Sequence, residues 1–319
     1  MSSPDTLTVG LAQIAPVWLD RTRTLAKIVD WVERAAASGC GLVAFGETLL
    51  PGYPFWVERT DGARFNSPVQ KTLYAHYLDQ AVQIERGDLR PLCEAAARYG
   101  IAVMVGCVER PMDRGGHSVY CSLVYIDAQG TVASVHRKLM PTYEERLVWS
   151  PGDGNGLRVH ALGAFTVGGL NCWENWMPLP RAALYAQGED LHVAVWPGGG
   201  HNTGDITRYI AKESRSYVLS VSGLMRASDI PASTPHREQI AGDDMAQVFA
   251  NGGSCIAGPD GKWIAEPVTN EETLVVATLE HRRVREERQN FDPVGHYSRP
   301  DVTQLVVDRQ RQSTLKLRD

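Results

Sequence analysis

The chain has 319 residues, of which 43% are hydrophobic and 22% are charged, and its formal net charge is −5 at pH 7. This composition fits a globular protein with a sizeable core, and the negative net charge argues against nucleic acid or an anionic membrane as a partner. No apolar run approaches the ~20 residues that cross a bilayer, and the first residues lack a secretory signal pattern. We therefore expect a cytoplasmic protein.

The six cysteines form no C-x-x-C pair, and their spacings suit neither a zinc site nor a disulfide framework. Reduced thiols are the simpler interpretation. The glycine-rich loop at 150–156 lacks the Lys-Ser/Thr ending of a phosphate-binding loop. We expect neither a metal ion nor another cofactor.

Strand and helix patterns alternate in the first half of the chain. Residues 21–39 repeat apolar side chains at three- and four-residue intervals, which predicts an amphipathic helix. Residues 42–45 are a short apolar run typical of a buried strand. The expected strands are 6–15, 42–45, 101–109, 118–127 and 131–137, and the expected helices are 21–39, 69–86 and 88–99.

The second half repeats this rhythm, with strands at 164–171, 191–197, 217–224, 253–257 and 273–279 and helices at about 177–187 and 203–216. Residues 258–261 predict a hairpin turn. Two similar α/β halves favour two sheets packed together with helices outside. We expect one domain at 1–280 and a C-terminal extension at 281–319. The charged residues 280–289 predict a solvated helix, the segment 292–301 is irregular, and the extension is available for contacts between subunits.

Three residues with ionisable side chains lie at the ends of expected strands, namely Glu47, Lys138 and Cys172. Cys172 lies at a corner where a strand gives way to a helix, and nearby amide N–H groups favour its thiolate form. Each residue alone has a plainer interpretation: a buried cysteine, a helix-capping glutamate and a solvated lysine. Together they supply a nucleophile, a proton acceptor and a cation for the hydrolysis of a nitrile or an amide.

The motifs around these residues resemble nitrilases of the carbon–nitrogen hydrolase superfamily over essentially the whole chain. The motifs are Phe45-Gly46-Glu47 with Pro51-Gly52-Tyr53-Pro54, His136-Arg137-Lys138-Leu139-Met140-Pro141-Thr142, and Asn171-Cys172-Trp173-Glu174-Asn175 with Met177-Pro178-Leu179 and Arg181. The resemblance implies an α/β fold, a four-layer αββα sandwich, and a homo-oligomer of dimers that extend to larger or spiral assemblies.

The same resemblance implies the roles of the site residues. Glu47 is the general base, Lys138 stabilises charge, Cys172 is the nucleophile, and Glu145 positions the lysine and the substrate. The thiol attacks a small-molecule nitrile to give a thioimidate and then a thioester, with the Trp173 backbone N–H as a further donor. One departure is Gly46, where such enzymes often carry proline, which is expected to loosen the turn.

Other functions stay open at this point. An amidase or carbamoylase of the same superfamily uses the same three groups, although Trp173-Glu174-Asn175 and His136-Arg137-Lys138 favour nitriles. A nitrile or cyanide hydratase that releases the amide is a further alternative. A Cys-His peptidase lacks a recognisable histidine setting, and a non-catalytic scaffold is expected to lose part of the triad.

Aromatic residues near the motifs are candidates for substrate binding. Tyr53, Trp173 and Trp196 are expected to line a pocket, which would suit aromatic nitriles. The alternative is that they fill the core or an interface between subunits.

Overall fold

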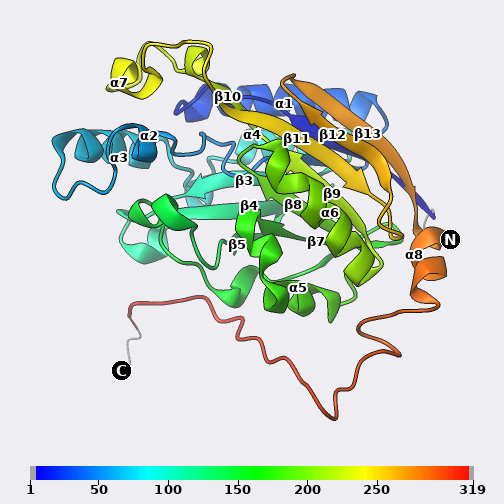
Figure 1. Cartoon of the computed structure of the whole chain (residues 1–319). Helices are drawn as coiled ribbons and strands as arrows, with labels where there is room; N and C mark the ends of the chain where they lie inside the picture. Colours follow the sequence, from blue (N-terminus) through cyan, green and yellow to red (C-terminus); the bar gives the residue numbers. More distant parts are fainter. Residues whose placement is uncertain (1–4, 316–319) are drawn as a thin grey trace.

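The computed structural model describes residues 5–315, whose strands form two sheets (Figure 1). The first sheet has the order β13-β1-β2-β3-β4-β5 and the second the order β10-β11-β9-β8-β7-β6, with β12 paired to β11. The strands are β1 (Thr6–Gln13), β2 (Leu42–Phe45), β3 (Ala102–Glu109), β4 (Tyr120–Ile126), β5 (Val132–Arg137), β6 (His160–Leu162), β7 (Phe165–Asn171), β8 (Leu191–Trp196), β9 (Tyr217–Ser222), β10 (Leu224–Arg226), β11 (Val248–Ala257), β12 (Trp263–Thr269) and β13 (Thr273–Glu280).

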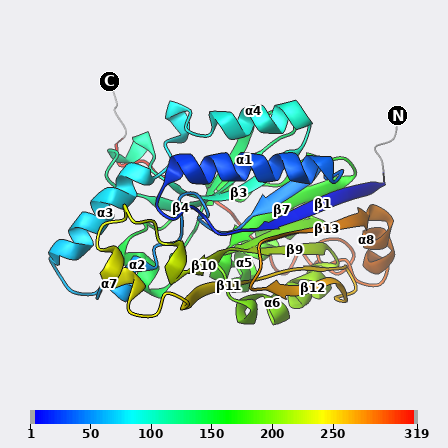
Figure 2. The ribbon, with the colours of Figure 1, turned by 90° about the horizontal axis from the view of Figure 1, so that it is seen from above.

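Helices lie on the outer faces of the two sheets. In Figure 2, α1 and α4 lie on the side of the first sheet, and α6 lies on the opposite side against the second sheet. The helices are α1 (Arg21–Ala37), α2 (Trp56–Arg59), α3 (Pro68–Gln80), α4 (Arg90–Tyr99), α5 (Pro178–Tyr185), α6 (Gly200–Ser214), α7 (Arg237–Ala241) and α8 (His281–Arg288). The expected α/β class and four-layer αββα order are confirmed.

The interior layer between the sheets explains why the strands read as apolar runs. Val9 and Leu11 of β1 pack in one buried cluster with Val193 and Val195 of β8. Their neighbours face the helices instead, so both faces of the central strands are covered and the strands carry few polar residues. Within residues 5–315, no helix has both the length and the apolar character needed to cross a membrane.

The expected elements match the structure except in a few places. The helix expected at 69–86 stops at Gln80, because the Val82 backbone N–H leaves the helical pattern and donates to the Val108 carbonyl at 2.7 Å. A 3-10 turn, η1 (Ile84–Arg86), follows. The strand expected at 253–257 is the end of the longer β11, and the hairpin at 258–261 leads into β12, which was not expected in full.

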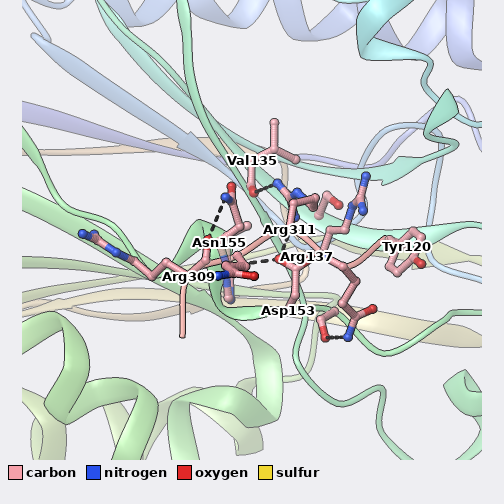
Figure 3. Close-up of polar contacts among 12 residues, drawn as sticks. Tyr120, Val135, Arg137, Asp153, Asn155, Arg309 and Arg311 are labelled. Carbon is pink, nitrogen blue, oxygen red and sulfur yellow. Dashed lines mark hydrogen bonds and ion pairs between the residues drawn. The ribbon is translucent and has the colours of Figure 1, made fainter. Parts of the chain in front are cut away.

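The segment after α8 swings away from the body and then runs back beneath α5 in the view of Figure 1. Residues 289–315 contain no helix or strand, yet their far end is held by specific contacts. The Arg311 guanidinium donates to the Asp153 carboxylate at 2.9 Å and to the Val135 carbonyl at 3.0 Å, and Asn155 donates to the Arg309 carbonyl at 3.0 Å (Figure 3). Interactions with the chain's own body therefore hold this end of the extension.

Candidate active site

The three residues at expected strand ends come together in the interior. Glu47 follows β2 of the first sheet, Lys138 follows β5 at the edge of the same sheet, and Cys172 follows β7 of the second sheet. Their side chains are buried, with at most 3% of each residue exposed. One ligand atom each from Glu47, Glu145 and Cys172 lies within 4.8 Å of the others. The packing of one sheet on the other thus places residues far apart in sequence around one point.

The Lys138 ammonium group lies between two carboxylates. Its Nζ is 3.0 Å from Glu47 Oε1 and 2.7 Å from Glu145 Oε2. Glu145 belongs to the 3-10 turn η3 (Tyr143–Leu147), where its Oε2 also accepts from the Thr142 backbone N–H at 2.6 Å. The cluster that contains Glu47, Glu145 and Lys138 therefore has one carboxylate more than it has cations.

Burial of this excess carboxylate changes the proton affinity of the cluster. Burial raises the pKa of Glu47 to about 7, opposed by the Lys138 charge and reinforced by Glu145. Burial also disfavours the charged form of Lys138, but the negative neighbours, Glu47 first among them, raise its pKa well above the ordinary value. Lys138 is thus a permanent cation, and Glu47 is a carboxyl group that exchanges its proton near neutral pH.

Cys172 forms the corner between β7 and the short 3-10 turn η5 (Cys172–Trp176). Its φ of +46° is unusual for a residue with a side chain and turns the chain sharply. The Trp173 backbone N–H lowers the pKa of the thiol, as expected of a nearby amide group, but larger effects oppose it: burial, and next the Glu47 charge, raise this pKa well above its ordinary value, and Lys138 offsets them only in part. The helix behind the corner, α5, begins only at Pro178, so no long helix N-terminus faces the thiol. A nucleophilic role for this thiol would therefore require a base.

The same side chains include groups that ligate cations in other proteins. Two carboxylates and a thiol offer three ligand atoms, a set compatible with a divalent metal. Lys138 Nζ, however, already lies at hydrogen-bond distance from both carboxylates. The ammonium group therefore supplies the positive charge at this point.

A buried carboxylate, to which the sequence assigned no structural role, joins the lysine strand to the cysteine corner. Glu174 accepts from the backbone N–H of Leu139 at 2.6 Å and of Asn171 at 3.0 Å, and lies 3.0 Å from His136 Nε2. These contacts lower the pKa of Glu174 despite its burial, with His136 the largest favourable contribution. The Glu174 carboxylate therefore fixes the position of Lys138 relative to Cys172.

Further groups close to the triad carry no signal that would identify them in the sequence. Cys121, in the apolar strand β4, lies with its Sγ 3.4 Å from Glu47 Oε1. The Trp149 ring lies with its centroid 5.6 Å from Lys138 Nζ, at cation–π distance. Both residues read as ordinary core positions because only the pairing of distant segments brings them to the site.

The three aromatic residues expected to bind substrate occupy different environments. The Tyr53 hydroxyl donates to Glu145 Oε1 at 3.0 Å and lies 3.2 Å from Glu144 Oε1, so it belongs to the carboxylate cluster. Trp173 is 51% exposed. Trp196 is fully buried, its indole N–H lies 3.3 Å from Ser220 Oγ, and its carbonyl accepts from the Glu47 backbone N–H at 3.0 Å.

Comparison with known proteins shows the family to which the chain is related. The family model of the carbon–nitrogen hydrolases matches residues 8–289. Nitrilase 2 of an unknown prokaryotic organism is 39% identical over 315 residues, covering 98% of this chain and 96% of that protein. An aliphatic nitrilase of Sinorhizobium fredii is 34% identical over 315 residues, covering 97% of this chain and 98% of that protein. A carbon–nitrogen hydrolase structure from Helicobacter pylori shares the fold, with a TM-score of 0.69 and 17% identity over 93% of this chain and 96% of that one.

Proposed function

We propose that this protein, which belongs to the carbon–nitrogen hydrolase family, is a nitrilase that converts a small-molecule nitrile to the carboxylic acid and ammonia. The observation that carries the proposal is the buried group of Cys172, Glu47, Lys138 and Glu145, with the ammonium between the carboxylates and the thiol beside them. This group combines a nucleophile, a base of suitable pKa and a fixed cation. The family relationship to proteins named nitrilase supports the same assignment.

In the first step, Cys172 Sγ attacks the nitrile carbon while Glu47 accepts the thiol proton. A base whose pKa is about 7 suits this task near neutral pH. Glu47 then passes the thiol proton to the nitrile nitrogen, which restores its carboxylate, and the product is a thioimidate bonded to Sγ. The Lys138 ammonium and the Trp173 backbone N–H, which lies close enough to lower the pKa of the thiol, stabilise charge that develops on the nitrogen.

In the second step, water adds to the thioimidate carbon after Glu47 takes one of its protons. The resulting tetrahedral carbon carries sulfur, a hydroxyl group and an amino group. Protonation of the amino group lets the C–N bond break, so that ammonia leaves and a thioester remains. A second water then breaks the C–S bond, releasing the acid and restoring the thiol. Glu145 acts through Lys138, which it holds at 2.7 Å.

The substrate class is proposed as nitriles in general. The aromatic groups at Tyr53, Trp173 and Trp196 support a preference for aromatic nitriles, with Trp196 packed behind the site because it is fully buried. One close relative is named an aliphatic nitrilase, so aliphatic nitriles belong in any test as well.

We propose further that the protein works in the cytoplasm as a homo-oligomer, with a catalytic domain at 1–280 and the extension at 281–319 contributing contacts between subunits. The six free cysteines suit a reducing compartment. Exposed apolar side chains on and before α5, among them Trp176 and Leu179, suit burial by a second copy. Sedimentation should then give a mass above the 35.1 kDa of one chain.

The test is a panel of aromatic and aliphatic nitriles, together with the matching amides, assayed for ammonia and acid. The purified protein should release both products from nitriles, and Cys172→Ala should abolish turnover. Intact mass after rapid quenching should show an acyl adduct on the wild-type chain and none on Cys172→Ala. Faster consumption of the amides than of the nitriles would replace the proposal with an amidase, and unchanged turnover by Cys172→Ala would remove the nucleophile.

A further inference from the structure

A second polar chain lies behind the cysteine corner and takes no part in the chemistry described so far. Glu189 lies just before β8, His192 is the second residue of β8, and Asn175 belongs to the turn η5; each is fully buried. His192 Nδ1 lies 2.9 Å from Glu189 Oε1, and His192 Nε2 lies 2.8 Å from Asn175 Oδ1. The Asn175 amide then donates to the Cys172 carbonyl at 2.8 Å and approaches the Leu170 carbonyl at 3.2 Å.

The direction of these hydrogen bonds follows from the two carbonyl groups at the end of the chain. Carbonyl oxygens only accept, so Asn175 must turn its NH₂ group toward Cys172 and Leu170 and its oxygen toward His192. His192 Nε2 must therefore carry a proton to donate to that oxygen. The remaining nitrogen, Nδ1, is hydrogen-bonded to Glu189 Oε1 at 2.9 Å. The Glu189–His192 pair thus supports the asparagine in this orientation from the side away from Cys172.

One glycine provides the space that the Glu189 carboxylate occupies. A Cβ atom added at Gly168, in β7 opposite His192, would lie 2.2 Å from Glu189 Oε1. Only glycine therefore lets the buried carboxylate approach β7. On the other side, Arg181 donates to the Asn175 backbone carbonyl at 2.7 Å, which holds the turn itself in place.

We propose that Glu189, His192 and Asn175 form a positioning relay that holds the Cys172 backbone in its left-handed conformation and thereby favours acid over amide as the product. A residue with a side chain is strained at a φ of +46°, and this backbone conformation persists only when the surrounding structure enforces it. The two bonds from the Asn175 amide supply that constraint on the carbonyl side of the corner. This proposal rests on the nitrilase function proposed above.

The link to the product lies in the tetrahedral intermediate. Loss of ammonia breaks the C–N bond and requires that a correctly placed group first protonate the amino nitrogen. Loss of the thiol breaks the C–S bond, releases the amide, and needs no such help because thiolate is the better leaving group. If the Cys172 backbone is loosened, the intermediate shifts relative to the buried acid–base groups. Ammonia loss then slows, and amide is released instead.

The experiment compares the amide-to-acid ratio of wild type with Glu189→Ala and Asn175→Ala, using one aromatic nitrile. We expect the ratio to rise about tenfold, a change of about 1.4 kcal/mol between the two barriers. Glu189→Gln should stay close to wild type, because its amide can donate to His192 Nδ1 while Nε2 keeps its proton for Asn175. Both expectations concern a ratio, so a smaller yield of folded protein does not change them.

The matched control is His281→Ala. It removes a similar histidine–carboxylate pair, His281 Nε2 to Asp190 Oδ2 at 2.8 Å, that has no bond to the cysteine corner. Its ratio should equal that of wild type. If Glu189→Ala and Asn175→Ala also keep the wild-type ratio, or if Glu189→Gln changes as much as Glu189→Ala, the relay is overturned.

A second readout separates the relay from the proposed function. The rate of Cys172 alkylation by iodoacetamide, located by peptide mass spectrometry, needs no nitrile turnover. Loosening of the buried corner should raise this rate several-fold in Glu189→Ala and Asn175→Ala but not in His281→Ala. If wild type hydrolyses no nitrile, the proposed function fails and the alkylation rates still decide the relay. Equal rates in all four proteins would reject it.

Discussion

At the scale of single residues, the site depends on a neutral thiol beside a carboxyl group that titrates near neutrality. Cys172 is buried, and its pKa is raised, so the thiol must lose its proton during attack rather than before it. In the proposed mechanism Glu47 accepts this proton, and burial brings its pKa to about 7, a value suited to that transfer. The proposed chemistry therefore requires both Cys172 and Glu47, and not a cysteine that is already a thiolate.

Replacement of the base should affect the chemical step far more than binding. Glu47→Gln keeps the shape of the side chain and removes its ability to accept a proton. We expect kcat to fall by about 10²–10⁴, the usual contribution of a positioned acid or base, with little change in KM. Steady-state kinetics on one nitrile measures this. A loss of less than tenfold would assign proton transfer to another group.

The pH dependence of kcat/KM follows from the same carboxyl group. A base works only when deprotonated, so activity should be low in acid and rise through a midpoint near the Glu47 pKa of about 7. The residual activity of Glu47→Gln should lack this midpoint. A wild-type midpoint at the ordinary glutamate value of 4.5 would show that the buried cluster does not control the reaction.

At the scale of elements, the position of Glu47 depends on the close contact of β3 with the turn after β2. A Cβ atom added at Gly106 would lie 2.3 Å from the Gly46 carbonyl oxygen and 2.7 Å from Glu47 Cα. Gly46 is also confined, since its own Cβ would lie 2.9 Å from the Gly223 backbone nitrogen. The glycine at 46, expected to loosen the turn, is thus needed for close packing against the second sheet.

Gly106→Ala should accordingly lower both stability and activity. The backbone around Glu47 must move to admit the methyl group, which costs about 1–3 kcal/mol as overpacking of a core and displaces the base. Thermal unfolding and kcat measure the two effects. The control is Gly204→Ala in α6, where no atom lies within 4 Å of the new Cβ. That change should stabilise the helix by about 0.5–1 kcal/mol. Equal behaviour of the two variants would refute this account.

At the scale of the whole molecule, the C-terminal extension is fastened to the loop behind Lys138. Arg311 pairs with Asp153, whose side chain is only 5% exposed. In the same loop the Gly152 backbone N–H donates to the Lys138 carbonyl at 2.8 Å. The C-terminal extension is therefore linked to the backbone of Lys138 through the loop that contains Gly152 and Asp153.

Loss of the Arg311 guanidinium should release the extension. Arg311→Ala leaves the nearly buried Asp153 carboxylate without its charged partner, and we expect a loss of about 1 kcal/mol after allowance for partial exposure of the arginine. Differential scanning calorimetry and the rate of proteolytic cleavage after residue 300 measure this change. Arg299→Ala is the control, because its pair with Asp301 is exposed. A similar change in both variants would mean that the Asp153 contact does not fasten the extension.

The sequence by itself determined the alternation of strands and helices, and the three motif residues that lie at strand ends. These features depend on local periodicity and turn chemistry, which a single sequence displays directly. The resemblance of the motifs then predicted the αββα order and the grouping of Glu47, Lys138, Glu145 and Cys172, and the structure brings these residues together.

Only the tertiary structure decided the protonation of that group and the residues that support it. The thiolate expected at Cys172 is a neutral thiol because burial and a neighbouring carboxylate, neither visible in sequence, outweigh the local amide groups. The motif displays Glu174 and Asn175, but the sequence does not show that they contact His136 and the Glu189–His192 pair. Their partners lie on other segments, so their roles are created by the packing of the chain and not by its local order.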